Sequence, residues 1–364
     1  MISKMKTKAS IIEGWHFNKE VYKNAHENDR LEKLVTELSN VCNLSCPSCF
    51  TKKVDGSWTK KGKKRLIDEL SYEDQIALIN EAGNLGIRTV DFVGAGEPLL
   101  DIRFESIINY IKNLNMYSVV FTHGATPNFQ EIAQKFKEDK VSFFIKLWSQ
   151  NPALQQRYVG GSVPNYLDKR DQALQTLIDL GHNTGTGTVV DGINYQTTRM
   201  GADILVMKSN YNEIPDIFRY CRENNIMPEI KTYIPEGPTR FSHELAKQKY
   251  SLNELIKLRK DEISTEAFEE LRKEIKRIDQ DEFGIPRMDV LYPQGCKCTQ
   301  SIGSLYVTVQ GDIRSCVGTH VSYGKYMPRK DMLSKTLQKR KTKERLSFDC
   351  IPRIEEEKAR NVGN

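Results

Sequence analysis

Strand-like and helix-like segments alternate along most of the chain. Apolar runs predict strands at residues 31–38, 88–93, 118–122, 141–147, 203–207 and 227–234. Amphipathic patterns between and after them predict helices at residues 71–84, 102–114, 130–138, 166–180 and 213–224. This rhythm is typical of a parallel sheet covered by helices, so we expect an α/β fold.

Several local signals sharpen this picture. Ser71 is followed three residues later by Asp74, a capping-box pattern that predicts a helix start, and Gly86 is a plausible stop. Near the C-terminus, the sequence SLYVTVQGDIRSC predicts a β-hairpin with Gly311 at its turn. Residues 182–199 break the rhythm and indicate an insertion, with a short strand at 188–190.

Composition agrees with a folded globule. Hydrophobic residues make up 38% of the 364 residues and charged residues 28%, which leaves enough apolar material for a core. The length suggests one large domain and a small one. No apolar run is long enough to span a bilayer, and the first residues lack the apolar stretch of a secretory signal. We therefore expect a cytoplasmic protein without a membrane partner.

Eight cysteines in a cytoplasmic chain point to metal binding or redox chemistry rather than to disulfides. Cys42, Cys46 and Cys49 follow the first predicted strand, with three and two residues between them. Thiolates are the usual ligands of iron–sulfur clusters, which are normally held by four, so three on one loop leave one iron open. A structural zinc site would need a fourth nearby ligand, and no His or Cys follows before the second strand.

The stretch CNLSCPSCF resembles the signature loop of the radical S-adenosylmethionine (SAM) superfamily. The resemblance implies a four-iron, four-sulfur (4Fe-4S) cluster on the three cysteines, whose open iron binds the amino and carboxylate groups of SAM. Phe50 stands where the family has an aromatic residue near the adenine. Zinc binding or simple packing of the three cysteines is the alternative.

A second motif supports the first. Gly94, Ala95, Gly96, Glu97 and Pro98 follow the second strand and resemble the family's Gly-Gly-Glu-Pro motif, which holds the SAM amino group. The chemistry is reasonable, because glycine lets backbone approach a ligand closely and a carboxylate can receive an ammonium.

Two later segments match less closely. FTHGA at 121–125 resembles the family's third-strand segment, with His123 in place of Asn, and IKLWS at 145–149 aligns with its fourth. The resemblance suggests that Lys146 and Ser149 contact the carboxylate and ribose of SAM. A salt-bridged Lys146 or a packed Trp148 is the alternative.

The resemblance covers residues 31–240 and implies a partial (β/α)6 TIM-like barrel. In this family an electron from the cluster cleaves SAM, and the resulting 5′-deoxyadenosyl radical removes a hydrogen atom from the substrate. The protein supplies binding, orientation and the exclusion of side reactions.

Four further cysteines lie near the C-terminus: Cys296, Cys298, Cys316 and Cys350. Their spacing around Gly311 resembles the first half of the SPASM domain of radical SAM enzymes, or the shorter twitch domain. This implies a small α+β domain with an auxiliary 4Fe-4S cluster. Because only one residue separates Cys296 and Cys298, one of them either leaves an open iron or is a spare thiol. Structural zinc on these thiolates is the alternative.

The expected organisation is therefore an N-terminal extension at 1–30, the radical SAM barrel at 31–240, a charged helical bridge at 241–290 and a SPASM/twitch-like domain at 291–364.

Family resemblance favours oxidation of a small polar substrate such as a sugar or aminocyclitol, most directly by dehydrogenation. Radical epimerisation is an alternative, with Cys221, or whichever of Cys296 and Cys298 is not a ligand, as the hydrogen donor. Modification of a ribosomal peptide is another. Cys221 stands mid-helix, where a lone cysteine is more often a small buried side chain.

Basic residues gather at 52–65 and 325–345. Such runs attract acidic partners, which suggests docking of an acidic flavodoxin or ferredoxin as electron donor. Few aromatic residues accompany them, so RNA binding or RNA modification ranks low. A non-enzymatic iron–sulfur scaffold would not need the motif at 94–98.

Overall fold

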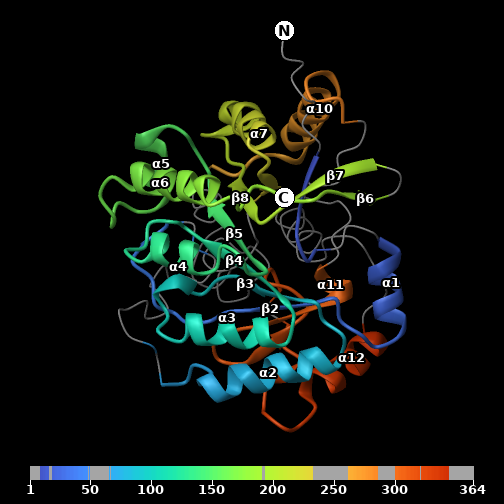
Figure 1. Ribbon diagram of the computed structural model, residues 1–364. Coiled ribbons are helices and arrows are strands. Elements are labelled where there is room, and N and C mark those ends of the chain that lie inside the picture. The colour runs from blue at the N-terminus through green and yellow to red at the C-terminus, as the bar shows by residue number, and fades with distance from the viewer. Residues whose placement is uncertain are drawn as a thin grey trace, which may run out of the picture. The chain divides into compact units, whose positions relative to one another are not determined.

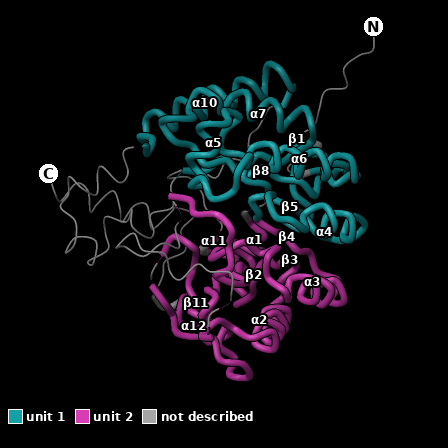
Figure 2. The backbone as a smooth tube through the Cα atoms, turned by 90° about the vertical axis from the view of Figure 1, so that its left-hand side faces the viewer, with its two compact units in different colours: residues 1–18, 122–233, 261–294 teal, residues 19–121, 234–260, 295–364 magenta. Residues whose placement is uncertain are grey.

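The computed structural model (Figure 1) describes residues 9–15, 19–47, 49, 65, 67–190, 193–232, 261–285, 300–319 and 321–343. The chain divides into two compact units that interleave along the sequence (Figure 2). Unit 1 comprises 1–18, 122–233 and 261–294, and unit 2 comprises 19–121, 234–260 and 295–364. The organisation expected from the sequence, with segments 1–30, 31–240, 241–290 and 291–364, stays a prediction.

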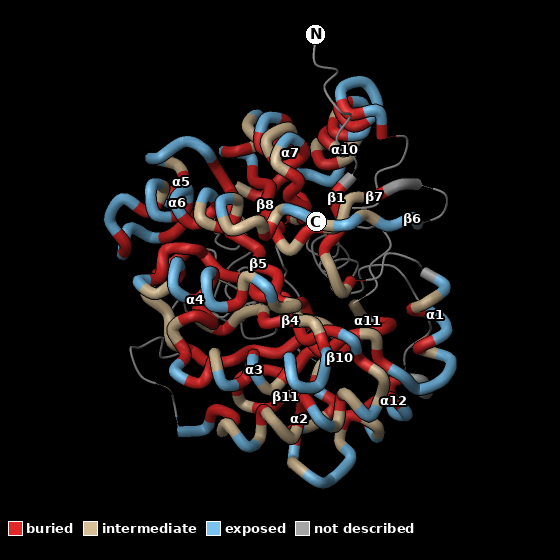
Figure 3. The backbone as a smooth tube through the Cα atoms, in the orientation of Figure 1, coloured by how far each residue is buried: buried red, intermediate tan, exposed pale blue. Residues whose placement is uncertain are grey.

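A mostly parallel sheet forms the centre of unit 2. Its strands are β2 (Lys33–Thr36), β3 (Thr89–Phe92), β4 (Tyr117–Thr122), β10 (Ser304–Val307), β11 (Asp312–Arg314) and β12 (Gly324–Lys325). They lie in the order β12-β11-β10-β2-β3-β4. Strands β10, β2, β3 and β4 run parallel, while β11 and β12 are antiparallel additions at one side. Strands β2, β3 and β10 are buried along their whole length (Figure 3).

The helices of unit 2 are α1 (Lys19–Glu27), α2 (Tyr72–Asn84), α3 (Phe104–Asn113), α11 (Gln300–Gly303) and α12 (Met332–Lys343), with a 3-10 turn η1 (Pro98–Leu100). The predicted capping box is confirmed: the Asp74 N–H donates to Ser71 Oγ and the Ser71 N–H to Asp74 Oδ2, each at 3.1 Å. Helix α3 buries one side, with Phe104 and Ile108 among the buried residues.

The predicted C-terminal hairpin is confirmed as β10 and β11, and Gly311 at its turn has a φ of 83° that favours glycine. Strand β10, the first strand of this hairpin, pairs with β2 and so belongs to the sheet of unit 2 rather than to a separate sheet. The buried Glu37, directly after β2, explains the attachment. Its carboxylate accepts hydrogen bonds from the Tyr306 hydroxyl and from the Val309 N–H, which lie at and after the end of β10.

Unit 1 contains two sheets. Strands β5 (Val141–Lys146), β8 (Met200–Leu205) and β9 (Met227–Lys231) are parallel neighbours in that order. The other sheet has the order β1-β7-β6, with β1 (Ala9–Ile12), β6 (Thr188–Val190) and β7 (Ile193–Thr198). The short strand expected within 182–199 is therefore present, but pattern reasoning missed β7. It also missed β1, which pairs in parallel with β7 and so ties residues of the expected N-terminal extension into a sheet.

The helices of unit 1 are α4 (Phe129–Lys135), α5 (Pro152–Tyr158), α6 (Tyr166–Asp179), α7 (Ile214–Glu223) and α10 (Thr265–Asp281), with a 3-10 turn η2 (Tyr211–Glu213). Helix α10 covers the described part of the expected charged bridge. No helix among the described residues is both long and apolar enough to cross a membrane.

A buried ion pair joins α7 to α10 within unit 1. The Arg222 guanidinium donates to both carboxylate oxygens of Asp279, at 2.8 and 3.0 Å, and both side chains are almost inaccessible to solvent. Removing one member of such a pair leaves an uncompensated buried charge, whereas replacing both by apolar groups does not.

We therefore expect Arg222→Met to destabilise the protein by about 3–5 kcal/mol. The double variant Arg222→Met/Asp279→Leu should recover most of this loss, because no charge is left buried. Urea denaturation of the three proteins measures the difference. A double variant as unstable as the single one would show that packing, not the unpaired carboxylate, carries the cost.

Candidate functional site: the cysteine loop and the glycine loop

The cysteine loop, residues 39–49, follows β2 in unit 2. Cys46 is buried, and Cys42 and Cys49 are half-buried. The Leu44 N–H approaches Cys42 Sγ at 3.5 Å. Backbone N–H groups aimed at sulfur favour the thiolate and adjust the potential of a bound iron–sulfur cluster. Phe50, the expected adenine contact, lies outside the described residues.

Within the described part of the chain, no three His, Cys, Asp or Glu side chains gather closely enough to hold a single metal ion. A four-iron cluster does not require such a gathering, because each of its cysteines binds a different iron. The donor set of three thiolates on one loop therefore fits a cluster with one open iron.

The glycine loop, residues 94–97, follows β3 and contacts the cysteine loop directly. The Glu97 N–H donates to the Val41 carbonyl oxygen at 2.7 Å. A Cβ atom placed on Gly96 would lie 2.1 Å from the same oxygen, so only glycine allows this approach. Gly94 has a φ of 108°, in the region that favours glycine. Both glycines are thus required by the backbone, and the two predicted motifs lie side by side.

The Glu97 side chain is buried and lies at the start of η1, where its carboxylate accepts a hydrogen bond from the Leu99 N–H at 3.3 Å. Ala95 is buried as well. The Glu97 backbone thus contacts the cysteine loop, while its carboxylate is bound to the backbone of η1.

In unit 1, Lys146 and Ser149 lie at and after the end of β5. Lys146 Nζ lies 4.4 Å from the ring centroid of Trp148, a cation–π distance. Ser149 is fully buried, and its hydroxyl lies 2.8 Å from both carboxylate oxygens of Glu213. The Ser149 hydroxyl, which the family resemblance suggests as a contact to the SAM ribose, thus has Glu213 as its acceptor.

Three charged residues that sequence reasoning missed lie beside Lys146 in unit 1. Lys231 Nζ, on β9, is 2.6 Å from Asp203 Oδ1 and 3.2 Å from Glu229 Oε2. The Trp148 Nε1–H donates to Asp203 Oδ2 at 3.4 Å. Burial alone would lower the pKa of Lys231, but the carboxylates of Asp203 and Glu229 outweigh it and raise the pKa. Lys231 therefore stays charged at neutral pH.

The sequence did contain a signal for the charged group of Asp203, Glu229 and Lys231. Asp203 was taken as the first residue of a strand at 203–207, whereas β8 spans 200–205, which places Asp203 in register with Lys146 on one side and Glu229 on the other. Charged residues within three adjoining strands would have indicated a polar cluster. Carboxyl ends of parallel strands are the usual position of active sites in barrel folds.

Comparison with known proteins identifies the fold and the chemistry. Residues 36–203, which include both loops, match the family described as the radical SAM superfamily. The chain contains a radical SAM domain. Its cofactors are those of the superfamily, a 4Fe-4S cluster and SAM, and its fold class is the expected α/β partial barrel.

Curated relatives and solved structures agree with this assignment. A protein named "Probable GTP 3',8-cyclase" from Methanococcus maripaludis is 25% identical over 236 residues, which is 64% of this chain and 68% of the relative. A protein of the same name from Methanocaldococcus jannaschii is 22% identical over 249 residues, 67% of this chain and 72% of the relative.

Among solved structures, Streptococcus suis SuiB bound to the precursor peptide SuiA has a TM-score of 0.59 at 16% identity, covering 86% of this chain and 67% of that one. The structure of anSMEcpe with bound AdoMet has a TM-score of 0.56 at 13% identity, covering 91% and 96%. At these identities the structural likeness establishes the fold.

The remaining cysteines of the radical SAM protein fall into two groups. Cys221 is fully buried in α7, and burial raises the pKa of its thiol to about 12. This environment favours a core role over hydrogen donation. Cys316, in unit 2, is half-buried. Three further predicted ligands lie outside the described residues: Cys296, Cys298 and Cys350.

The contact of the two loops gives a direct test. Gly96→Ala should disrupt it, because the new methyl group would overlap the Val41 carbonyl oxygen. We expect lower iron content after reconstitution and weaker SAM binding. Gly83→Ala is the matched control, since nothing lies within 4 Å of its added methyl group and alanine is the better helix former in α2. Equal iron content and equal SAM affinity in the two variants would contradict the structural role of Gly96.

Proposed function

We propose that the protein is a radical SAM enzyme that removes hydrogen from a small polar substrate, most directly a dehydrogenase, with the reactive cluster on Cys42, Cys46 and Cys49. The observation that carries this proposal is the contact of the cysteine loop with the glycine loop through Glu97 and Val41. The contact brings cluster ligands and a candidate SAM-binding backbone together within unit 2.

Each part of the two loops has a distinct role in the proposal. The three thiolates hold the cluster and leave one iron for SAM. The glycine loop approaches SAM through its backbone, and Glu97 receives the SAM ammonium. When bound, cluster and SAM together supply the 5′-deoxyadenosyl radical that abstracts hydrogen. Phe50 remains the proposed adenine contact, and Lys146 and Ser149 the proposed contacts to the rest of SAM.

A dehydrogenase must also remove a second electron from its substrate, and the C-terminal cysteines are the proposed ligands of the acceptor, an auxiliary 4Fe-4S cluster. Proximity to the hairpin supports this arrangement. The half-buried Cys316 follows the end of β11 by two residues. Cys298 precedes Ser304 by six residues in the sequence.

The polar cluster of unit 1 supports a polar substrate. Asp203, Glu229 and Lys231 bring two carboxylates and an ammonium together, and the buried Trp148 donates its Nε1–H to Asp203. Such a set suits a molecule rich in hydroxyl or amino groups. Cytoplasmic location and electron delivery by a flavodoxin or ferredoxin at the basic residues 52–65 belong to the same proposal.

Two other outcomes have specific support. The name shared by the curated relatives favours cyclisation of GTP. The peptide bound to SuiB favours a peptide substrate. Radical epimerisation needs a hydrogen donor, and the burial of Cys221 leaves it poorly placed for that role.

Anaerobic reconstitution tests the reaction class. The wild-type protein should bind about eight irons, four in each of two clusters, and should form 5′-deoxyadenosine with dithionite. Changing Cys42, Cys46 and Cys49 together to Ala should remove about half of the iron and all cleavage of SAM. Cleavage that persists in the triple variant would refute the assignment of the reactive cluster to this loop.

Substrate class is tested by turnover with aminocyclitols, sugars, peptides and GTP. We expect a polar cyclitol or sugar to raise 5′-deoxyadenosine formation and to yield a product lighter by two hydrogens. Asp203→Asn should reduce this stimulation while the basal cleavage of SAM continues, because the change weakens the charge cluster but not the cysteine loop. Stimulation by GTP alone, with a cyclised product, would replace the dehydrogenase proposal by the cyclase.

A further inference from the structure

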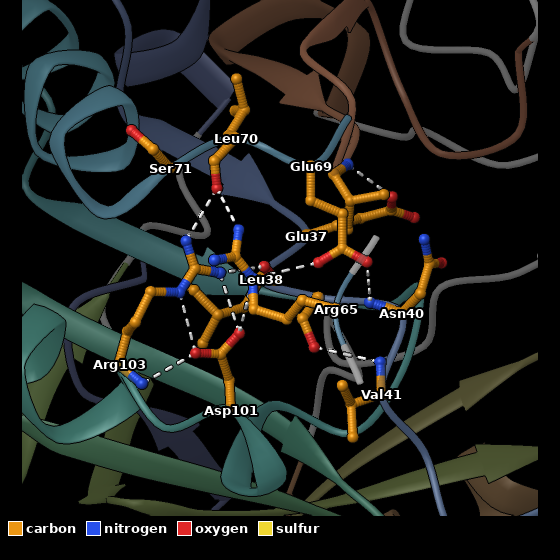
Figure 4. A network of polar contacts seen from close by, with 12 residues as sticks. Glu37, Leu38, Asn40, Val41, Arg65, Glu69, Leu70, Ser71, Asp101 and Arg103 are labelled. Carbon is orange, nitrogen blue, oxygen red and sulfur yellow. Dashed lines mark hydrogen bonds and ion pairs between the residues drawn. The ribbon is translucent and has the colours of Figure 1, made fainter. Parts of the chain in front are cut away.

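Two ion pairs lie beside the start of the cysteine loop, one of them buried and the other with a partly exposed arginine (Figure 4). The first is Arg103 with Asp101. The Arg103 guanidinium donates to both carboxylate oxygens of Asp101, at 2.9 and 2.8 Å. The same guanidinium donates to the carbonyl oxygens of Leu38 and Leu70, each at 2.7 Å. One side chain therefore binds three separate segments of unit 2.

The second pair is Arg65 with Glu69. Arg65 Nε lies 3.2 Å from Glu69 Oε2, and the other oxygen of Glu69 accepts the Asn40 N–H, also at 3.2 Å. Arg65 also donates to the Leu70 carbonyl oxygen at 2.5 Å and lies 3.8 Å from Asp101. The two pairs thus form one network with two positive and two negative charges.

The network holds the chain just before Cys42. Arg103 binds the carbonyl of Leu38, and Glu69 binds the N–H of Asn40. The next residue, Val41, is bound from the other side by the Glu97 N–H of the glycine loop. Three successive contacts thus fix the backbone that leads into the cysteines.

Asp101 connects the same network to the glycine loop. It ends the short turn η1, which begins directly after Glu97, and it accepts the backbone N–H of Arg103 at 2.8 Å. Because η1 is only three residues long, Asp101 is rigidly linked to Glu97. Arg103 therefore binds the end of the glycine-loop segment through Asp101, and it binds the start of the cysteine loop through the Leu38 carbonyl oxygen.

Stability alone does not account for such a network. Buried ion pairs contribute little net stability relative to apolar residues of the same size, because both charges lose their hydration. What Arg103 provides that an apolar side chain does not is a planar fork of donors with fixed directions. Outer-shell partners of this kind orient metal ligands and change affinity or activity when they are lost.

We propose that Arg103, held by Asp101, is a positioning residue that sets the cysteine loop against the glycine loop and thereby the placement of SAM at the cluster. The inference rests on the proposed assignment of the reactive cluster to Cys42, Cys46 and Cys49. It adds a residue outside both motifs to the machinery that aligns the two cofactors.

The test compares Arg103→Lys with Arg222→Lys in the reconstituted full-length protein. Arg222 is the matched control, because it too is buried and bound to both oxygens of a carboxylate, but in unit 1. Lysine keeps the charge and loses the fork in both variants. Equilibrium dialysis with labelled SAM, electron paramagnetic resonance (EPR) of the reduced protein, iron analysis and thermal unfolding are measured on both.

We expect Arg103→Lys to retain iron but to bind SAM about 10–100-fold more weakly, with an altered EPR spectrum of the SAM-bound state. Arg222→Lys should bind SAM as the wild type does, even where its melting temperature falls. Asp101→Asn keeps the size of the side chain but replaces one acceptor oxygen of the ion pair by a donor NH2 group. It replaces Arg103→Lys if that variant does not fold, and it should weaken SAM binding in the same direction.

SAM affinity and an EPR spectrum equal to those of the wild type would overturn the positioning role and leave Arg103 a structural residue. Loss of SAM affinity to the same extent in Arg222→Lys would overturn it as well. Failure of the underlying cluster assignment is a different result: the triple cysteine variant would then still cleave SAM, whatever Arg103 does.

Discussion

A single close contact between two backbones governs the geometry of the proposed active site. The Glu97 N–H donates to the carbonyl oxygen of Val41 at 2.7 Å, and Gly96 leaves no room there for a side chain. Because Val41 immediately precedes Cys42, a change in this contact would shift the proposed cluster ligands relative to the candidate SAM-binding loop. The parallel pairing of β2 with β3 brings the two loops to the same edge of the sheet.

The surroundings of this contact are arranged to hold it. Glu37, at the end of β2, binds residues at the end of β10 through its carboxylate, and its carbonyl oxygen accepts a hydrogen bond from the buried Gln75 of α2 at 3.1 Å. Arg103 and Glu69 then hold the next backbone groups. The C-terminal strand β10 thus stabilises the very segment from which the cysteine loop begins, and the proposed auxiliary-cluster region is physically linked to the reactive site.

Local signals were predictable from sequence, and long-range pairings were not. The capping box at Ser71, the turn at Gly311 and the two cofactor motifs each depend on neighbouring residues, so their patterns are visible in the chain. The pairing of β10 with β2 joins residues about 270 positions apart. The polar group around Lys231 was missed because an error of three residues in the start of β8 disguised the register of Asp203. Arg103 carries no motif, and its proposed role rests on its burial and its four acceptor atoms in the structure.

The central claim is that the cysteine loop and the glycine loop together place SAM at an open iron. EPR spectroscopy of the dithionite-reduced protein, with and without SAM, tests it most directly. The account predicts a 4Fe-4S signal that changes shape on addition of SAM in the wild type and in Gly83→Ala, and that changes little in Gly96→Ala. A wild-type spectrum identical with and without saturating SAM would contradict it.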